Sequence, residues 1–157
     1  MSELPTVLDG NLESTYRANF VNFRFIYDLM RVVGVRGDKL DVLLSQSGDS
    51  FGYDLVLRCN GKTRYVQMKV KKEDGQDGWE VHQSLKLDPD GFLVVVELTF
   101  NLDKDNVILK YRVWDRGKLA NIPLKYTNGQ LDKKFYVGKN VLTNRLSLPQ
   151  VANKLFY

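Results

Sequence analysis

The sequence has 157 residues, of which 43% are apolar and 27% charged, and its formal net charge is +4 at pH 7. This composition is usual for a globular domain and excludes an intrinsically disordered chain. The longest apolar run, FLVVVEL at 92–98, is too short to cross a bilayer, and a lone cysteine, Cys59, excludes an internal disulfide and multi-cysteine zinc sites. We therefore expect a single domain over residues 1–157 that stays in the cytoplasm without membrane contact.

Positive charge is concentrated in the later part of the chain. Residues 61–157 contain 17 Lys and Arg against 11 Asp and Glu, whereas residues 1–60 contain 6 against 8. This asymmetry favours a polyanionic partner such as nucleic acid. A lysine-rich surface that serves only solubility is an equally common explanation.

The first predicted element is a helix over about residues 11–32. Its apolar residues recur at steps of three and four, which is the spacing of one helical stripe, and they are Leu12, Tyr16, Phe20, Phe23, Tyr27 and Met30. Gly34 follows close to the natural end of such a helix. We expect this helix to cover a sheet.

The remaining pattern is mostly that of strands. We expect a short strand or loop at 40–44, a hairpin at 52–70, a strand or short helix at 79–87, a central strand at 92–100 and another strand at 107–114. Asn128-Gly129 predicts a second hairpin turn, and Ser147 can cap a short C-terminal helix. The sum predicts an α+β fold with a mixed or antiparallel sheet of about five strands.

The register of the first hairpin follows from its turn. If Asn60-Gly61 forms a two-residue type I′ turn, Cys59 pairs with Lys62 and the pairing steps outward until Asp54 faces Gln67. Lys69 then projects on the same face as Gln67, because side chains alternate along a strand. The other face carries apolar side chains, which are Leu55, Leu57, Val66, Met68 and Val70.

This polar group has a chemical use. A carboxylate opposite an amide carbonyl offers Asp54 and Gln67 as two oxygen ligands for Mg²⁺. Lys69, beside the cation, can orient an attacking water and neutralise a phosphate in the transition state. Glu13, in the first turn of the long helix, is a candidate for the further acid that the site needs, and Glu80 is a reserve ligand.

These residues resemble the PD-(D/E)XK nuclease superfamily in a Gln-x-Lys variant, over about residues 11–72. The resemblance implies a restriction-endonuclease-like α/β/α core and a DNA phosphodiesterase that uses Mg²⁺ or Mn²⁺. It implies Asp54 as the main metal ligand, Gln67 as the second with help from the Met68 carbonyl, Glu13 as the helical acid and Lys69 as the catalytic lysine. A homodimer is also expected, since a small catalytic domain often needs two copies to cut both strands.

Each residue also has a purely structural interpretation. Asp54 can simply begin a strand, Lys69 can belong to a solvated face with Lys71 and Lys72, and Glu13 can be favoured by the helix dipole.

Other residues extend the hypothesis or stand apart from it. Lys71, Lys72 and Gln83 are candidate phosphate contacts, and Tyr111 and Trp114 are either stacking surfaces or core. The lone histidine, His82, is interpreted as structural, because the sequence indicates no nucleophilic partner for it.

The predicted function is a metal-dependent DNA endonuclease in repair, restriction or defence. The alternative is an inactive protein of nuclease fold, regulatory or conferring immunity, that docks on a partner protein.

Overall fold

The structure is a computed structural model that describes residues 14–45, 52–72, 78–101, 106–138, 141 and 143–157. Its helices and strands follow in the order α2 Ser14–Val35, β1 Asp41–Leu44, β2 Leu55–Cys59, β3 Lys62–Lys72, β4 Gly78–His82, α3 Gln83–Leu87, β5 Gly91–Asn101, β6 Asn106–Trp114, α4 Arg116–Ala120, β7 Tyr126–Thr127, β8 Gln130–Leu131, β9 Lys134–Gly138 and α5 Leu148–Phe156. In these ranges no helix is both long and apolar enough to cross a membrane.

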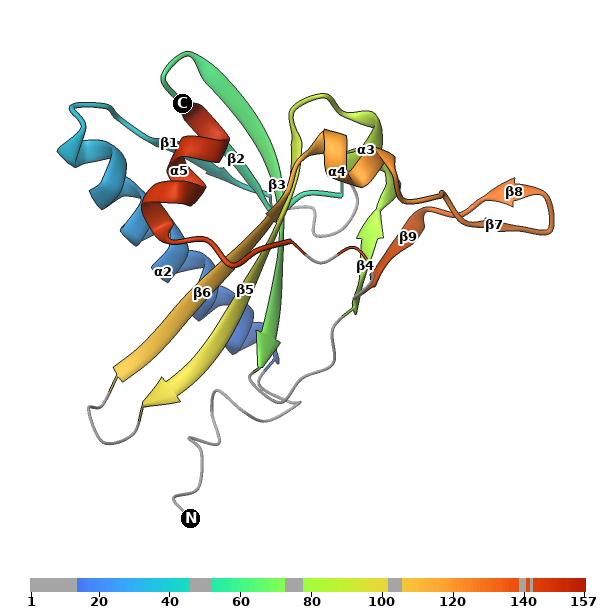
Figure 1. Cartoon of the computed structure of the whole chain (residues 1–157), viewed down its shortest axis with the longest axis horizontal. Coiled ribbons are helices and arrows are strands. Elements are labelled where there is room, and N and C mark those ends of the chain that lie inside the picture. The colour runs from blue at the N-terminus through green and yellow to red at the C-terminus, as the bar shows by residue number, and fades with distance from the viewer. Residues whose placement is uncertain (1–13, 46–51, 73–77, 102–105, 139–140, 142) are drawn as a thin grey trace.

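The centre of the molecule is a mixed sheet of five strands in the order β1-β2-β3-β5-β6 (Figure 1). β3 and β5 are parallel, and the other neighbours are antiparallel. Between β3 and β5 the chain passes through β4 and α3, the kind of crossover that a parallel pair requires. The predicted α+β class and the mixed five-stranded sheet are confirmed.

The hairpin of β2 and β3 has the predicted register. Asn60 and Gly61 both have positive φ, at 50° and 70°, as a type I′ turn requires. The ladder runs from Cys59 opposite Lys62 to Leu55 opposite Val66. The turn dipeptide and the alternation of apolar residues therefore fix the same pairing.

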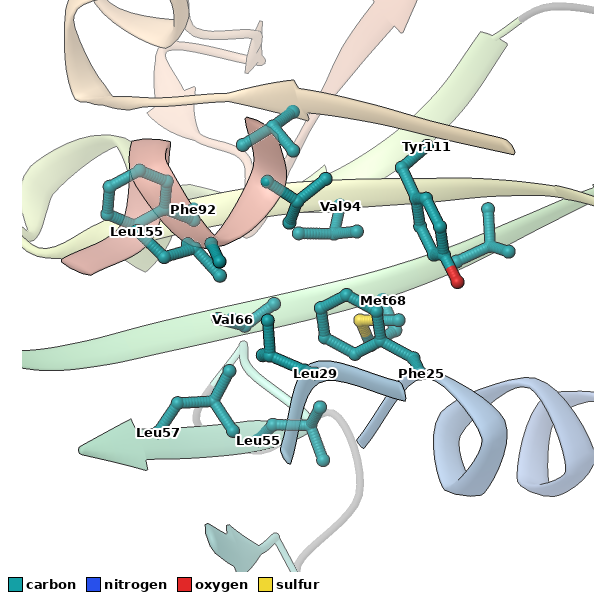
Figure 2. Packing of buried hydrophobic residues seen from close by; sticks show 14 of the residues in the cluster. Phe25, Leu29, Leu55, Leu57, Val66, Met68, Phe92, Val94, Tyr111 and Leu155 are labelled. Carbon is teal, nitrogen blue, oxygen red and sulfur yellow. The ribbon is translucent and has the colours of Figure 1, made fainter. Parts of the chain in front are cut away.

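One face of the sheet forms the first core with α2 and α5. Figure 2 shows Phe25 and Leu29 of α2 facing side chains of β2 and β3. The buried residues of this core are Val21, Phe25, Leu29, Val33, Leu40, Leu55, Leu57, Cys59, Val66, Met68, Phe92, Val94, Val96, Leu98, Tyr111, Val113, Val151, Ala152, Leu155 and Phe156.

The opposite face is covered over part of its length by the second core. Its buried residues are Trp79, Val81, Leu85, Leu93, Val95, Trp114, Leu119, Ile122, Phe135 and Val137. β5 contributes alternate side chains to both cores, so it is the central, doubly covered strand that its continuous apolar run predicts.

The predicted stripe of α2 is not the face that packs on the sheet. The buried residues instead recur at steps of four, at Val21, Phe25, Leu29 and Val33, each with 0% exposure. Apolar residues occur on two faces of this helix, so their spacing alone could not select the inner one. The four large members of the predicted stripe that are exposed are Tyr16, Phe23, Tyr27 and Met30.

The end of α2 also differs from the prediction. The helix continues through Gly34 to Val35, and Gly37 takes the left-handed conformation at φ 85°. The Asp38 N–H then donates to the Val33 carbonyl at 3.1 Å, which closes the helix in a Schellman arrangement.

The C-terminal third is confirmed in part. Asn128-Gly129 does form a turn, but β7 and β8 are only two residues each. The strand after them, β9, pairs with β4 rather than across that turn. Tyr111 and Trp114 are 4% and 0% exposed, so their interpretation as stacking surfaces is wrong and the core interpretation is confirmed.

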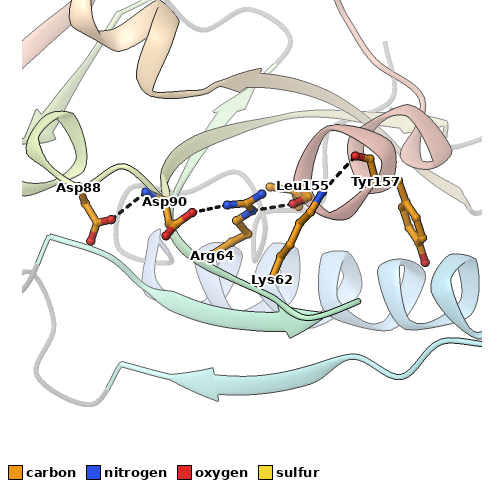
Figure 3. A network of polar contacts seen from close by, with 6 residues as sticks. All are labelled: Lys62, Arg64, Asp88, Asp90, Leu155 and Tyr157. Carbon is orange, nitrogen blue, oxygen red and sulfur yellow. Dashed lines mark hydrogen bonds and ion pairs between the residues drawn. The ribbon is translucent and has the colours of Figure 1, made fainter.

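α5 closes the first core and is capped as predicted. The Ser147 hydroxyl accepts from the Gln150 N–H, and the Gln150 side chain accepts from the Ser147 N–H, which makes a capping box. At its other end, Arg64 Nε donates to the Leu155 carbonyl at 2.6 Å and Lys62 Nζ to the Tyr157 carbonyl at 3.1 Å (Figure 3). The hairpin thereby holds the last helix in place.

Candidate functional site

Asp54 lies immediately before β2, at the open end of the hairpin. Its N–H donates to the Val66 carbonyl at 2.8 Å, just beyond the last pair of the ladder, Leu55 opposite Val66. Its Oδ2 accepts from the Met68 N–H at 2.7 Å. The carboxylate is therefore held against the backbone of β3, at the residue that follows Gln67. The ladder ends at Leu55 opposite Val66, so the pair of Asp54 with Gln67 stays a prediction.

Gln67 is buried on the face opposite to the first core, with only 2% exposure. Its Oε1 accepts from the His82 N–H at 3.2 Å, which links β3 to the end of β4. A buried amide without a partner would be costly, and this bond lowers that cost. An amide oxygen has a second lone pair, which can coordinate a cation.

Gly52 brings the chain leading to Asp54 close to His82 and Ser84. Its φ is +75°, and a Cβ at this position would clash with both of those side chains. Glycine is therefore required at this position for two reasons, the positive φ of the backbone and the close approach of the His82 and Ser84 side chains. His82 Nδ1 accepts from the Ser84 N–H at 3.2 Å and caps α3. This is the structural role expected for the lone histidine.

Lys69 and Lys71 continue along β3 on the same face as Gln67. In the parallel ladder with β5, Gln67 lies opposite Leu93, Lys69 opposite Val95 and Lys71 opposite Glu97. Both lysines are half-buried. The face thus changes from apolar, under the second core, to charged toward the end of β3 and β5.

Glu97 is a buried acid on this face, and the sequence prediction missed it. It is 6% exposed and accepts from Arg112 Nε at 2.7 Å and from Arg145 Nε at 2.6 Å. Burial raises the pKa of its carboxyl, but the hydrogen bonds and charges of the two arginines outweigh burial and hold the pKa below its ordinary value. The signal that could have found it is the single acid inside the apolar run FLVVVELTF.

The other predicted residues are placed as follows. Glu13 and the side chain of Lys72 lie outside the described residues. Glu80 is exposed on β4 opposite Tyr136, in a hollow lined also by Lys133 and Lys134. Gln83 begins α3, and its Oε1 is buried.

The oxygen donors at the hairpin fit a hard cation in kind but are few. The Asp54 carboxylate, the Gln67 amide oxygen and the Met68 carbonyl are donors of the class that Mg²⁺ prefers. In the part of the chain that the structure describes, no three His, Cys, Asp or Glu side chains are grouped to hold a metal. These donors therefore suit an ion that keeps most of its ligands as water or phosphate oxygen.

Comparison with known proteins gives little. No protein-family model matches the sequence, and no curated protein matches it. Among solved structures, Hjc, a Holliday junction resolvase from the archaeal hyperthermophile Archaeoglobus fulgidus, is similar at a TM-score of 0.40 and 15% identity, over 83% of this chain and 98% of that chain.

Proposed function

We propose that this chain is a metal-dependent nuclease of the PD-(D/E)XK type that hydrolyses phosphodiester bonds in DNA. The observation that carries the proposal is the hairpin itself. Asp54 is bonded to the Met68 backbone beside Gln67, and Lys69 follows on the same face, half-buried. An acid, an amide and a lysine in this order are what the sequence resemblance requires of a catalytic site.

Each residue then has a role. Asp54 and Gln67, with the Met68 carbonyl and Glu13, would hold Mg²⁺ or Mn²⁺. When bound, such an ion acts as a Lewis acid and lowers the pKa of a water molecule. Lys69 follows Gln67 by two residues on the same face of β3, and its ammonium would orient the water and stabilise negative charge on the phosphate. The bond from Met68 N–H fixes one Asp54 oxygen and so orients the carboxylate.

The remaining parts of the proposal concern the substrate. Lys71, Lys72 and Gln83 contact the DNA backbone, where Lys71 follows Lys69 on the same side of β3. The protein works in the cytoplasm as a single domain, and a second copy serves the second strand of a duplex.

The test uses substitutions that remove the charge of Asp54 or of Lys69. Purified protein is incubated with supercoiled plasmid and with labelled single-stranded DNA, in Mg²⁺, Mn²⁺ or EDTA. Asp54→Asn keeps an acceptor for the Met68 N–H but loses the negative charge, and Lys69→Ala removes the ammonium. We expect cleavage that needs metal and that falls at least about 100-fold in either variant.

The matched control is Lys39→Ala, which removes an exposed lysine outside the hairpin face. Circular dichroism and thermal denaturation must show all variants folded like the wild type. Cleavage that survives Lys69→Ala would come from a contaminant. Folded protein that cuts no substrate with either metal would contradict the proposal.

A further inference from the structure

The helix α2 has a second apolar face that its own fold leaves mostly exposed. Its inner face, Val21, Phe25, Leu29 and Val33, is fully buried in the first core. A helix on the surface of a globular domain normally carries one apolar stripe, opposite a polar face. Here the outward side is apolar as well, along the blue helix at the edge of Figure 1.

The apolar residues of this side form what we call the outer seam, which consists of Tyr16, Phe20, Phe23, Tyr27 and Met30. Their steps of four, three, four and three are the spacing of a heptad seam that packs against another helix. Phe20 is half-buried and also packs against the first core, and the other four are exposed. The exposed fractions of Tyr16, Phe23, Tyr27 and Met30 are 54%, 59%, 60% and 46%.

The surface of the outer seam contains a depression. A depression of about 540 Å³ lies along its N-terminal half, with Tyr16, Phe20, Phe23 and Tyr27 in its lining. Side chains of a second helix insert into such depressions when two helices pack. The shape therefore suits an elongated apolar ligand that is itself helical.

Arginines follow one flank of the outer seam. Arg17, Arg24 and Arg31 recur every seven residues, each directly after a seam residue. Asp28 pairs with Arg24 at 2.8 Å and with Arg31 at 3.7 Å, so Arg24, Arg31 and Asp28 together keep a net positive charge. The other flank, at Asn19 and Ile26, is uncharged.

This charge pattern disfavours a second copy of the chain as the occupant. In an antiparallel pair of α2 helices the arginine flanks would face each other, and like charges there are destabilising. In a parallel pair the arginines would face Asn19 and Ile26, which offer no carboxylate. Complementary charge instead requires acidic residues beside the seam of the incoming helix.

We propose that the outer seam binds an amphipathic helix of a partner protein, with an apolar heptad seam flanked by Glu or Asp. The four exposed side chains offer on the order of 100 Å² each. That is about half of the 800 Å² that one partner buries in an interface of standard size. The arginine stems add to it, so we expect a dissociation constant in the micromolar range. Gln67 and Lys69 lie on the other face of the sheet from the first core, which α2 covers.

The probe for this proposal is a synthetic peptide of 21 residues with Leu at its seam positions and Glu at the flanking ones. Its counterpart carries Lys at every Glu position. By fluorescence anisotropy we expect the Glu peptide to bind at least tenfold more tightly than the Lys peptide. Phe23→Ser should abolish binding, and the double substitution Arg24→Glu with Arg31→Glu should reverse the preference.

Tyr126→Ser is the matched control, since Tyr126 is 62% exposed and lies on β7 rather than on α2. Equal binding of the two peptides, or no binding of either, would overturn the proposal. So would a dimer in sedimentation experiments that Phe23→Ser dissociates, because the occupant would then be a second copy. Binding to phosphatidylserine vesicles without any peptide preference would assign the seam to a membrane surface instead.

Discussion

At the scale of single residues, the environment of Glu97 links the stability of the fold to pH. Its carboxylate is buried and bound by Arg112 and Arg145, which holds its pKa below the unfolded value. Such a group stabilises the fold above the unfolded pKa of about 4.3, and this stability is lost as the pH falls through the folded pKa. We expect Glu97→Gln to cost about 3 kcal/mol at pH 7 in urea denaturation. The deficit should shrink below pH 4.

The control for this measurement is Glu80→Gln, which changes an exposed acid on β4. Its free energy of unfolding should stay within about 0.5 kcal/mol of the wild type. A Glu97→Gln variant whose deficit is the same at pH 7 and at pH 3.5 would show that the carboxylate is not the source of the stability.

The sequence was informative about some residues and silent about others, for physical reasons. The position of Asp54 beside Gln67 is predictable because a two-residue turn and a period of two fix every pair in the hairpin. Glu97 has no such local pattern around it. Its partners, Arg112 and Arg145, come from 15 and 48 residues further along the chain, so only the folded sheet brings the three together. Glu13 remains a prediction.

At the scale of elements, two glycines should respond oppositely to the same substitution. Gly61 has φ +70° in the hairpin turn and Gly34 lies in α2, and a Cβ would have open space at either position. Gly61→Ala should destabilise the protein by about 1 kcal/mol, because L-residues disfavour the left-handed region. Gly34→Ala should stabilise it by about 0.5 to 1 kcal/mol through helix propensity.

Urea denaturation of both variants at one pH measures this difference. Because neither added methyl group meets a neighbour, the sign depends only on the backbone conformation. A Gly61→Ala variant as stable as Gly34→Ala would rule out the left-handed turn, and with it the register that places Asp54 beside Gln67.

The sequence predicts an element correctly where its residue pattern is compatible with only one local structure. The central strand, the hairpin and the Ser147 cap are of this kind. The sequence predicts the helix α2 but not which of its faces is buried. Apolar residues lie on more than one side of this helix, and their periodicity does not tell a face that packs within the chain from one that packs against another molecule. The pairing of β9 with β4 was also not foreseen, since strands far apart in sequence leave no local signal.

At the scale of the whole molecule, the two faces of the sheet should respond differently to salt. If DNA binds on the face that carries Lys69 and Lys71, each lysine that contacts a phosphate displaces the counterions condensed there. We expect Lys69→Ala and Lys71→Ala each to reduce the slope of log K against log salt by about 0.9. Binding is measured in EDTA, so that cleavage does not interfere.

Arg31→Ala is the control for the salt experiment, because Arg31 is exposed on α2 across the sheet from these lysines. Its slope should equal that of the wild type. If Arg31→Ala changed the slope and the two lysine variants did not, DNA would lie on the helix side, and the assignment of the two faces would have to be exchanged.

The junction of the hairpin with α5 makes Cys59 a reporter of local opening. The thiol is 2% exposed in the first core, and burial, together with the carboxylate of Asp38, raises its pKa. Asn60, the next residue, donates to the Phe156 carbonyl at 3.0 Å at the end of α5. A thiol reagent can reach the sulfur only while this corner is open. Since the chain has a single cysteine, the rate of labelling of the native protein measures how often α5 detaches, without any engineered probe.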